Sequence, residues 1–321
     1  MEITMDIATV SKNCSTITKE VRKAIIGKDD VLEKVIWCIL ADGHILFEDY
    51  PGLAKTLMAK SFASGCKFTR IQFTPDLLPA DITGTKIYNR KTMEFELREG
   101  PIFTNILLAD EINRAPPKTQ SALLEAMQER QTTIEGETRK MEKPFIVLAT
   151  QNPIEYEGTY PLPEAQVDRF LARLNIGYPS KEDEQNILER RIERKMDDVQ
   201  INRIIDPNTL LEMQKAVENV HIHKDIIKYI VEIVTKTRTH PPVEVGASPR
   251  GSLSLLKLAR ARAAFYGKDF VIPDDVKINA ESALAHRIIL KPEPWMQGIK
   301  PESIINSILA SVPVPKLDRG K

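Results

Sequence analysis

Short apolar runs alternate with helix-like stretches through the first half of the chain. Five runs stand out, each bounded by polar residues and each too short to form a helix. Runs of this length are typical of buried strands, and the helical patterns between them indicate the βα alternation of a mostly parallel sheet that helices cover on both faces. The predicted strands are residues 44–47, 68–73, 106–109, 145–150 and 173–176.

Two hairpins interrupt this alternation. A polar turn followed by alternating apolar positions predicts the first over residues 83–97, and Gly136 marks the turn of the second over residues 132–139. A helix is predicted between them over residues 117–130, because consecutive prolines introduce it and its leucines and methionine share one face. The first half of the chain therefore predicts an α/β core with a five-stranded sheet and two inserted hairpins.

The pattern changes to helices only after residue 178. Ser180 and Asp183 resemble a capping box at the start of one helix, and Pro273 with the acids behind it starts another. We therefore expect a boundary near residue 178. It would separate an α/β domain over residues 1–178 from an all-α domain over residues 179–321.

Composition narrows the class of protein. The 321 residues carry 45 Lys and Arg against 45 Asp and Glu, so no net charge draws the whole molecule to nucleic acid or to a membrane. Cys14, Cys38 and Cys66 have neither disulfide nor metal spacing, as in a reducing cytoplasm. No apolar run approaches the ~20 residues that span a bilayer, and the amino terminus lacks a signal-peptide pattern. We expect a cytoplasmic protein of two packed domains that share one ligand.

A candidate phosphate-binding loop follows the first predicted strand. A strand, a tight loop and a helix start together aim backbone N–H groups and the positive end of the helix dipole at one point, as a polyphosphate requires. Lys55 would reach the β- and γ-phosphates, and Thr56 would place its hydroxyl on Mg²⁺. Asp49 and Ala54 stand where the general pattern has glycines. The candidate residues are Asp49, Tyr50, Pro51, Gly52, Leu53, Ala54, Lys55, Thr56 and Leu57.

Two acids end the third predicted strand. Asp110 and Glu111 follow the apolar run 106–109, which would deliver them beside the loop. A phosphoryl-transfer site needs one acid to hold the Mg²⁺ shell and another group to orient or deprotonate the attacking water. Asp110 suits the first role and Glu111 the second. A strand that merely runs into solvent would explain the acids, but not their order after a Lys-Thr loop.

With these residues in place, the chain resembles the MoxR family of AAA+ ATPases. The similarity is almost continuous over residues 44–170, which makes it more specific than any single loop. This branch also has an acid at the first loop position and Ala before the lysine. The methyl group of Ala54 lies where backbone approaches phosphate, so weak nucleotide binding is expected. The matching runs are 51–56 (PGLAKT), 76–84 (DLLPADITG), 100–103 (GPIF), 108–120 (LADEINRAPPKTQ) and 246–250 (GASPR).

The resemblance implies roles for further residues. Asn152 matches the first sensor, which would orient the attacking water, although an Asn before proline is also an ordinary turn residue. Arg169 stands at the arginine finger, which reaches a neighbouring subunit's γ-phosphate; outside this family it would be a surface arginine. Arg250 matches the second sensor, which acts on its own subunit's nucleotide or on the adjacent one. Ile26 and Gly27 match the segment that packs on adenine, although a helix-terminating glycine explains them almost as well.

The resemblance also implies ATP and Mg²⁺ as cofactors and a homo-oligomeric ring, expected to be a hexamer, because an arginine finger acts only from another subunit. Hydrolysis would change the lid angle and swing the hairpins. The expected output is chaperone-like remodelling of a client protein, its maturation or the insertion of a cofactor or metal, with a von Willebrand A-domain partner. Neither nucleic acid nor membrane insertion is expected.

Three other functions stay open at this point. A DNA-translocating helicase has similar hairpins, but the first hairpin here holds few cations and no aromatic ladder for stacking bases. The AAA+ subunit of a metal chelatase, which inserts Mg²⁺ into a porphyrin, falls within the same resemblance. A nucleotide-gated scaffold would bind ATP without hydrolysing it, and Glu111 argues against that. His221 and His223 have no third ligand nearby in the sequence, so no metal site is expected there.

Overall fold

The computed structural model describes residues 5–48, 55–62, 65–152, 158–197, 199–202 and 205–315, without the side chains of Lys55 and Thr56. Its centre is a five-stranded parallel sheet in the order β2-β5-β8-β1-β9. All five predicted strands lie in this sheet, which confirms the predicted α/β core. The strands are β1 (Ile45–Glu48), β2 (Phe68–Gln72), β5 (Ile106–Asp110), β8 (Ile146–Gln151) and β9 (Ala172–Leu174).

The strand side chains alternate between two apolar clusters, one on each face of the sheet. Ile45 and Phe47 of β1 belong to one cluster, whereas Leu46 belongs to the other. Because both faces are buried there, the central strands β5 and β8 are apolar almost throughout, whereas the edge strand β2 also carries polar residues. One face is covered by α1 (Ile7–Val21), α2 (Asp29–Leu40) and α3 (Lys55–Phe62), and the other by η1 (Ile112–Arg114) and α5 (Pro117–Glu129).

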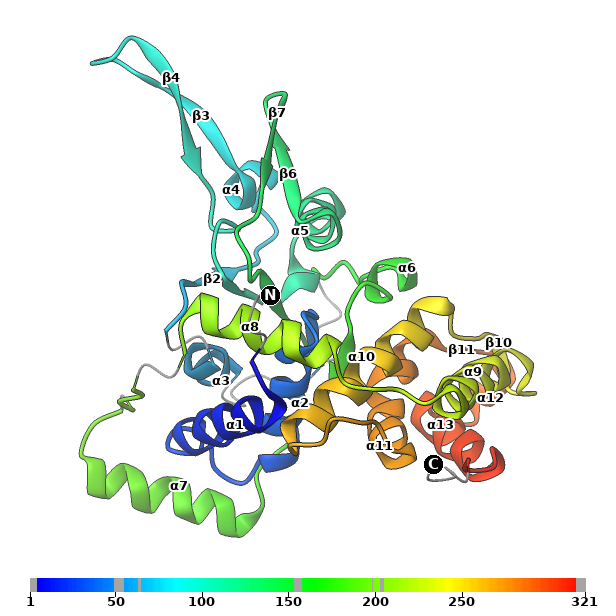
Figure 1. Cartoon of the computed structure of the whole chain (residues 1–321). Coiled ribbons are helices and arrows are strands. Elements are labelled where there is room, and N and C mark those ends of the chain that lie inside the picture. The colour runs from blue at the N-terminus through cyan, green and yellow to red at the C-terminus, as the bar shows by residue number, and fades with distance from the viewer. Residues whose placement is uncertain are drawn as a thin grey trace.

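Both predicted hairpins are present, and they project from the same side of the core (Figure 1). An ion pair joins them, with Lys86 Nζ 2.7 Å from Glu137 Oε1, and Thr85 Oγ1 donates a hydrogen bond to Glu135 Oε1. The first consists of α4 (Pro79–Thr83), β3 (Gly84–Asn89) and β4 (Glu94–Glu99), and the second of β6 (Gln131–Ile134) and β7 (Glu137–Lys140).

Helices dominate the chain after residue 178, as predicted. The Ser180 side chain caps α7 by accepting a hydrogen bond from the Asp183 backbone N–H, and α11 begins at Pro273. A small antiparallel sheet, β10 with β11, departs from the all-helical expectation, because such short strands show no periodicity in the sequence. The elements are α6 (Glu164–Val167), α7 (Lys181–Arg194), α8 (Pro207–Glu218), α9 (Lys224–Thr239), β10 (Val243–Val245), α10 (Pro249–Phe265), α11 (Pro273–Leu284), η2 (Ala285–Arg287), β11 (Ile289–Leu290), α12 (Pro292–Met296) and α13 (Pro301–Ser311).

One apolar cluster joins the sheet to the helical segment. Trp37 on α2 packs edge-on against Phe265 at the end of α10, with their ring centroids 6.1 Å apart. The Arg262 guanidinium lies 5.4 Å from the centroid of the Trp37 ring. Helix α2 therefore contacts both the sheet and the helices that follow residue 178.

Candidate functional site

The two predicted acids lie at the carboxyl edge of the sheet, where one threonine contacts both. Asp110 ends β5, and Glu111 follows it in the left-handed region with a φ of 55°. Thr150 on the neighbouring strand β8 is 1% exposed. Its Oγ1 donates to Asp110 Oδ1 at 2.6 Å and accepts from the Glu111 backbone N–H at 2.8 Å. A single hydroxyl therefore fixes the carboxylate of Asp110 and the strained backbone of Glu111.

Both carboxylates have further partners. Arg70 Nη2 lies 2.7 Å from Asp110 Oδ2. Gln72 donates to Glu111 Oε2 at 2.7 Å, and Arg114 Nη1 lies 2.9 Å from the same oxygen. None of these three partners is among the residues that the sequence predicted. The register of β2 against β5 is the signal that reveals Arg70 and Gln72, and it becomes visible only when the strands are paired.

The chain leaves β1 at this same edge. β1 pairs with β8, and β8 with β5, all in parallel, so the carboxyl end of β1 lies at the same edge of the sheet as the acids. The predicted phosphate-loop residues 49–54 lie outside the described residues. In the described residues helix α3 runs from Lys55 to Phe62, and the half-buried Leu57 packs against the apolar cluster. A helix start here offers backbone N–H groups and a positive dipole end to an anion.

Two other predicted positions are Asn152, which lies at the carboxyl edge of the sheet, and Gly27, which lies next to α7. Asn152 directly follows β8 and is 6% exposed, and its carbonyl accepts a hydrogen bond from Asn113 Nδ2 at 3.3 Å. Gly27 has a φ of 70°, and a Cβ there would lie 2.0 Å from the Asp183 carboxyl carbon of α7. Gly27 thus lies against α7, next to the half-buried Ile26. Its positive φ is the conformation that favours glycine.

The donors at the carboxyl edge suit Mg²⁺ and a nucleotide phosphate. Mg²⁺ prefers oxygen ligands such as carboxylates and hydroxyls. Asp110 offers a largely buried carboxylate whose Oδ1 is already oriented by Thr150. Its Oδ2 faces Arg70, whose side chain is 46% exposed, so a bound cation can replace that partner without disturbing the core. The side chains at the carboxyl edge of the sheet therefore fit a magnesium ion bound together with a nucleotide phosphate.

Arg169 and Arg250 lie together at the opposite edge of the sheet. Arg169 comes just before β9, and the Leu171 N–H donates to the His44 carbonyl just before β1, so this segment lies at the amino ends of both strands. Arg250 lies in the first turn of α10. Both arginines line a cavity of about 290 Å³. The Arg169 Nε is buried and has no hydrogen-bond partner in the described part of the chain.

This cavity is cationic. Its two acids are each paired with an arginine, Asp42 with Arg130 at 3.1 Å and Asp168 with Arg287 at 2.7 Å. His44 adds no charge, because burial and the neighbouring Arg130 lower its pKa to about 3. The lining therefore carries a surplus of positive charge, supplied by Arg169, Arg250 and Lys257.

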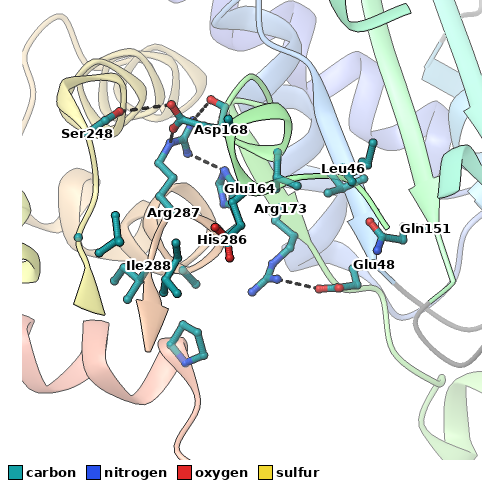
Figure 2. A pocket seen from close by; sticks show the side chains of 18 residues that line it. Leu46, Glu48, Gln151, Glu164, Asp168, Arg173, Ser248, His286, Arg287 and Ile288 are labelled. Atoms are coloured by element: carbon teal, nitrogen blue, oxygen red, sulfur yellow. Dashed lines mark hydrogen bonds and ion pairs between the residues drawn. The ribbon is translucent and has the colours of Figure 1, made fainter. Parts of the chain in front are cut away.

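A larger cavity, of about 490 Å³, lies at the junction of the sheet and the helical segment (Figure 2). Arg173 on β9 lines it, with Nη1 2.9 Å from Glu48 Oε2 and Nη2 2.9 Å from Glu302 Oε1 on α13. Glu48 is the last residue of β1, directly before the predicted phosphate loop. One arginine thus connects the entrance of that loop to a helix near the end of the chain.

The histidines, the cysteines and the apolar helices bear on other possible functions. Within the described ranges, no group of three or more His, Cys, Asp or Glu side chains is arranged to hold a metal ion. His223 instead caps α9 by accepting a hydrogen bond from the Asp225 N–H. Cys14 is a buried thiol, and its burial raises its pKa to about 12. No helix in the parts of the chain that the structure describes is long and apolar enough to cross a membrane.

Comparison with known proteins adds to this geometry. Residues 44–172 match the ATPase family associated with various cellular activities (AAA), and residues 235–308 match the AAA lid domain. The chain is 50% identical over 300 residues to YeaC, an uncharacterized protein of Bacillus subtilis, covering 92% of this chain and 93% of YeaC. It is 45% identical over 310 residues to the chaperone MoxR1 of Mycobacterium tuberculosis, covering 93% and 81% of the two chains. The crystal structure of a proposed ATPase from Cytophaga hutchinsonii is 42% identical, with a TM-score of 0.90 over 97% of each chain.

Proposed function

Since the chain belongs to the MoxR family of AAA+ ATPases, and is therefore a nucleotide-binding ATPase, we propose that it hydrolyses ATP with Mg²⁺ at the subunit interfaces of a homo-oligomeric ring. A core over residues 1–178 would bind the nucleotide, and a lid over residues 179–321 would respond to it. Gly27, which lies against α7, and the neighbouring Ile26 would contact the adenine.

The carboxyl edge of the sheet would supply one half of each site. Lys55, at the start of α3, would reach the β- and γ-phosphates, with the backbone of the preceding loop around them. Thr56 and Asp110 would hold Mg²⁺, which neutralises charge on the phosphates when bound. Glu111 would accept a proton from the attacking water, and Asn152 would orient that water.

The amino edge of the sheet, where Arg169 and Arg250 lie, would supply the other half of each site from the neighbouring subunit. β1 has four residues, and at ~3.3 Å per residue its first and last residues lie about 10 Å apart. Arg169 and Arg250 lie at the end away from the acids, so they cannot complete the site of their own subunit in this arrangement. They can complete a neighbour's site, and this separation is the observation that carries the proposal. We therefore assign both arginines a role in trans.

Repeated head-to-tail contacts of this kind close into a ring, which we expect to be a hexamer. Movement of the lid and hairpins would then remodel a client protein, mature it or insert its cofactor, together with a von Willebrand A-domain partner. The similarity to a protein named chaperone supports this output. The ion pair between Lys86 and Glu137 supports a joint movement of the two hairpins.

Phosphate release by wild type and by Glu111→Gln tests the enzymatic half of the proposal. Loss of the general base should lower the rate by roughly 10²-fold or more, while binding of ATP persists. Equal rates would remove Glu111 from the chemistry. The Glu111→Gln protein held with ATP should also retain client and partner, and recovery of nucleic acid alone would favour a DNA-translocating motor instead.

Subunit mixing tests the ring. Lys55→Ala removes the phosphate contact of a site, and Arg169→Ala removes the finger donated to the next site, so each variant alone should be inactive. In an equimolar mixture, roughly a quarter of the interfaces combine an intact site with an intact finger, and activity should return. If mixing restores nothing, the finger does not act from a neighbour.

A further inference from the structure

Arg287 in η2 binds the segment that carries the arginine finger. Its side chain is 2% exposed. Its Nε donates to Asp168 Oδ1 at 2.7 Å, and its Nη2 donates to the carbonyls of Asp168 at 3.1 Å and Phe170 at 2.7 Å. These partners lie immediately before and after Arg169. A buried arginine of the helical segment therefore fixes the backbone on both sides of the finger.

The remaining donors of Arg287 anchor it in its own helical segment. Nη1 donates to the Ala283 carbonyl at the end of α11 and contacts the Leu171 carbonyl at 3.5 Å. A guanidinium presents its donors in a rigid planar fork, so all of these contacts depend on one position of the side chain. A shift of η2 relative to β9 must either break several of them or move residues 168–171 along with it.

Asp168 connects this segment to a second lid element. Ser248, the N-cap of α10, donates from Oγ to Asp168 Oδ2 at 3.3 Å (Figure 2). Arg250 Nη1 lies 3.8 Å from the same oxygen. One carboxylate is thus shared between η2 and the first turn of α10. Asp168 therefore contacts Arg250, the proposed second sensor, and directly precedes Arg169, the proposed finger.

We infer that Arg287 and Asp168 are positioning residues through which the lid of one subunit sets the arginine that it presents to the nucleotide of the next. The inference rests on the proposed role of Arg169 in trans. When a nucleotide bound in a subunit's own site shifts the lid of that subunit, the hydrogen bonds of the Arg287 guanidinium transmit the shift to Arg169. The state of one site would then control hydrolysis in its neighbour, although the two nucleotides never touch.

Conservative substitutions of Arg287 and Asp168 test this positioning role. Arg287→Lys keeps the charge but loses the planar donors, and Asp168→Asn keeps the shape but loses the charge. Both should lower kcat about tenfold to a hundredfold, because displacing a catalytic group by about 1 Å has that effect. The KM for ATP should stay within about twofold, because neither residue contacts the subunit's own site. Arg260→Lys is the matched control: Arg260 is 24% exposed and pairs with Glu218 of α8 within the helical segment, away from the finger. It should leave kcat unchanged.

Mixing shows whether the defect acts in trans. Arg287→Lys subunits mixed with Lys55→Ala subunits should regain activity, because roughly a quarter of the interfaces then pair an intact site with a correctly held finger. A role confined to the subunit's own lid would give no recovery. Thermal melting and ATP binding check folding, and Asp168→Asn decides the question if Arg287→Lys does not fold.

Failure of this inference differs from failure of the proposed function. If Arg169→Ala is rescued by mixing, while Arg287→Lys and Asp168→Asn keep wild-type kcat or are not rescued, the lid does not position the finger. If Arg169→Ala itself is not rescued, the finger in trans is wrong, and the inference falls with it.

Discussion

Replacement of Thr150 by valine should separate the geometry of the acids from their chemistry. Valine keeps the size and β-branching of threonine, so the packing of β8 is preserved. It removes the hydroxyl that donates to Asp110 and accepts from the Glu111 N–H. Both acids stay in the chain, but the group that orients them is gone.

The cost follows from the two lost contacts. A backbone N–H left without a partner at this buried position costs about 1–3 kcal/mol, and a hydrogen bond to a carboxylate is worth about 1.5–3 kcal/mol. Asp110 keeps Arg70, which offsets part of the loss. We therefore expect a destabilisation of about 3 kcal/mol. Glu111, held at a φ of 55°, should relax toward a commoner conformation and lower kcat about a hundredfold.

Steady-state phosphate release and urea unfolding measure the two effects. Thr150→Ser keeps the hydroxyl and should retain most of the activity. Thr18→Val is the matched control, because it removes a buried hydroxyl that donates to the Cys14 carbonyl within α1. It should lower stability without lowering kcat. A Thr150→Val protein that is destabilised yet turns over within about twofold of wild type would refute the assigned role of Thr150.

Three further predictions concern pH, the lid and the hairpins. Burial lowers the pKa of His44 from 6.5 to about 3, so the unfolded chain binds a proton that the folded chain excludes; stability should be full above pH 6.5 and fall by about 2 kcal/mol by about pH 5. Urea midpoints against pH should show this slope in wild type and a shallower one in His44→Gln. Arg173→Met removes the bridge between Glu48 and Glu302. It should raise the KM for ATP several-fold and lower the free energy of unfolding, measured in urea, by about 1 kcal/mol. Glu302→Gln should have a smaller effect on both quantities. Lys86→Met breaks the ion pair with Glu137, so chymotrypsin should cut the first hairpin at Tyr88 or Phe95 several-fold faster, with an unchanged melting temperature; Lys91→Met at the tip should not alter the cleavage rate.

The sheet could be predicted because its strands are buried on both faces. Residues 106–109 and 145–150 are apolar at every position or nearly so, and this signal needs no knowledge of pairing. The hairpins were visible for the opposite reason, since alternation and a polar turn define them locally. The sheet of β10 and β11 was missed, because strands of three and two residues depend on tertiary contacts for their existence.

The candidate site was predictable only in part. The order of Lys55, Thr56, Asp110 and Glu111 along the chain is a local signal, and the resemblance supplied the arginines. Thr150, Arg70 and Arg287 could not be found in this way, because each acts through a partner that is 40 or more residues distant in the chain. Their roles follow from strand register and from the docking of the lid, which a single sequence does not encode in any short pattern.

The charges of the two edges of the sheet fit the proposed ring and the proposed chemistry together. At the carboxyl edge, Asp110 and Glu111 already contact Arg70 and Arg114, so that edge offers little uncompensated negative charge to a neighbour. At the amino edge, the cavity carries surplus cations, one of which, Arg169, has a buried Nε with no hydrogen-bond partner among the described residues. A triphosphate bound at the carboxyl edge supplies the anion that those cations lack, and desolvated arginine–phosphate contacts are among the stronger polar interactions. In the ring that we propose, the nucleotide would therefore serve both as substrate and as the charged element of the interface, and its hydrolysis would weaken that contact.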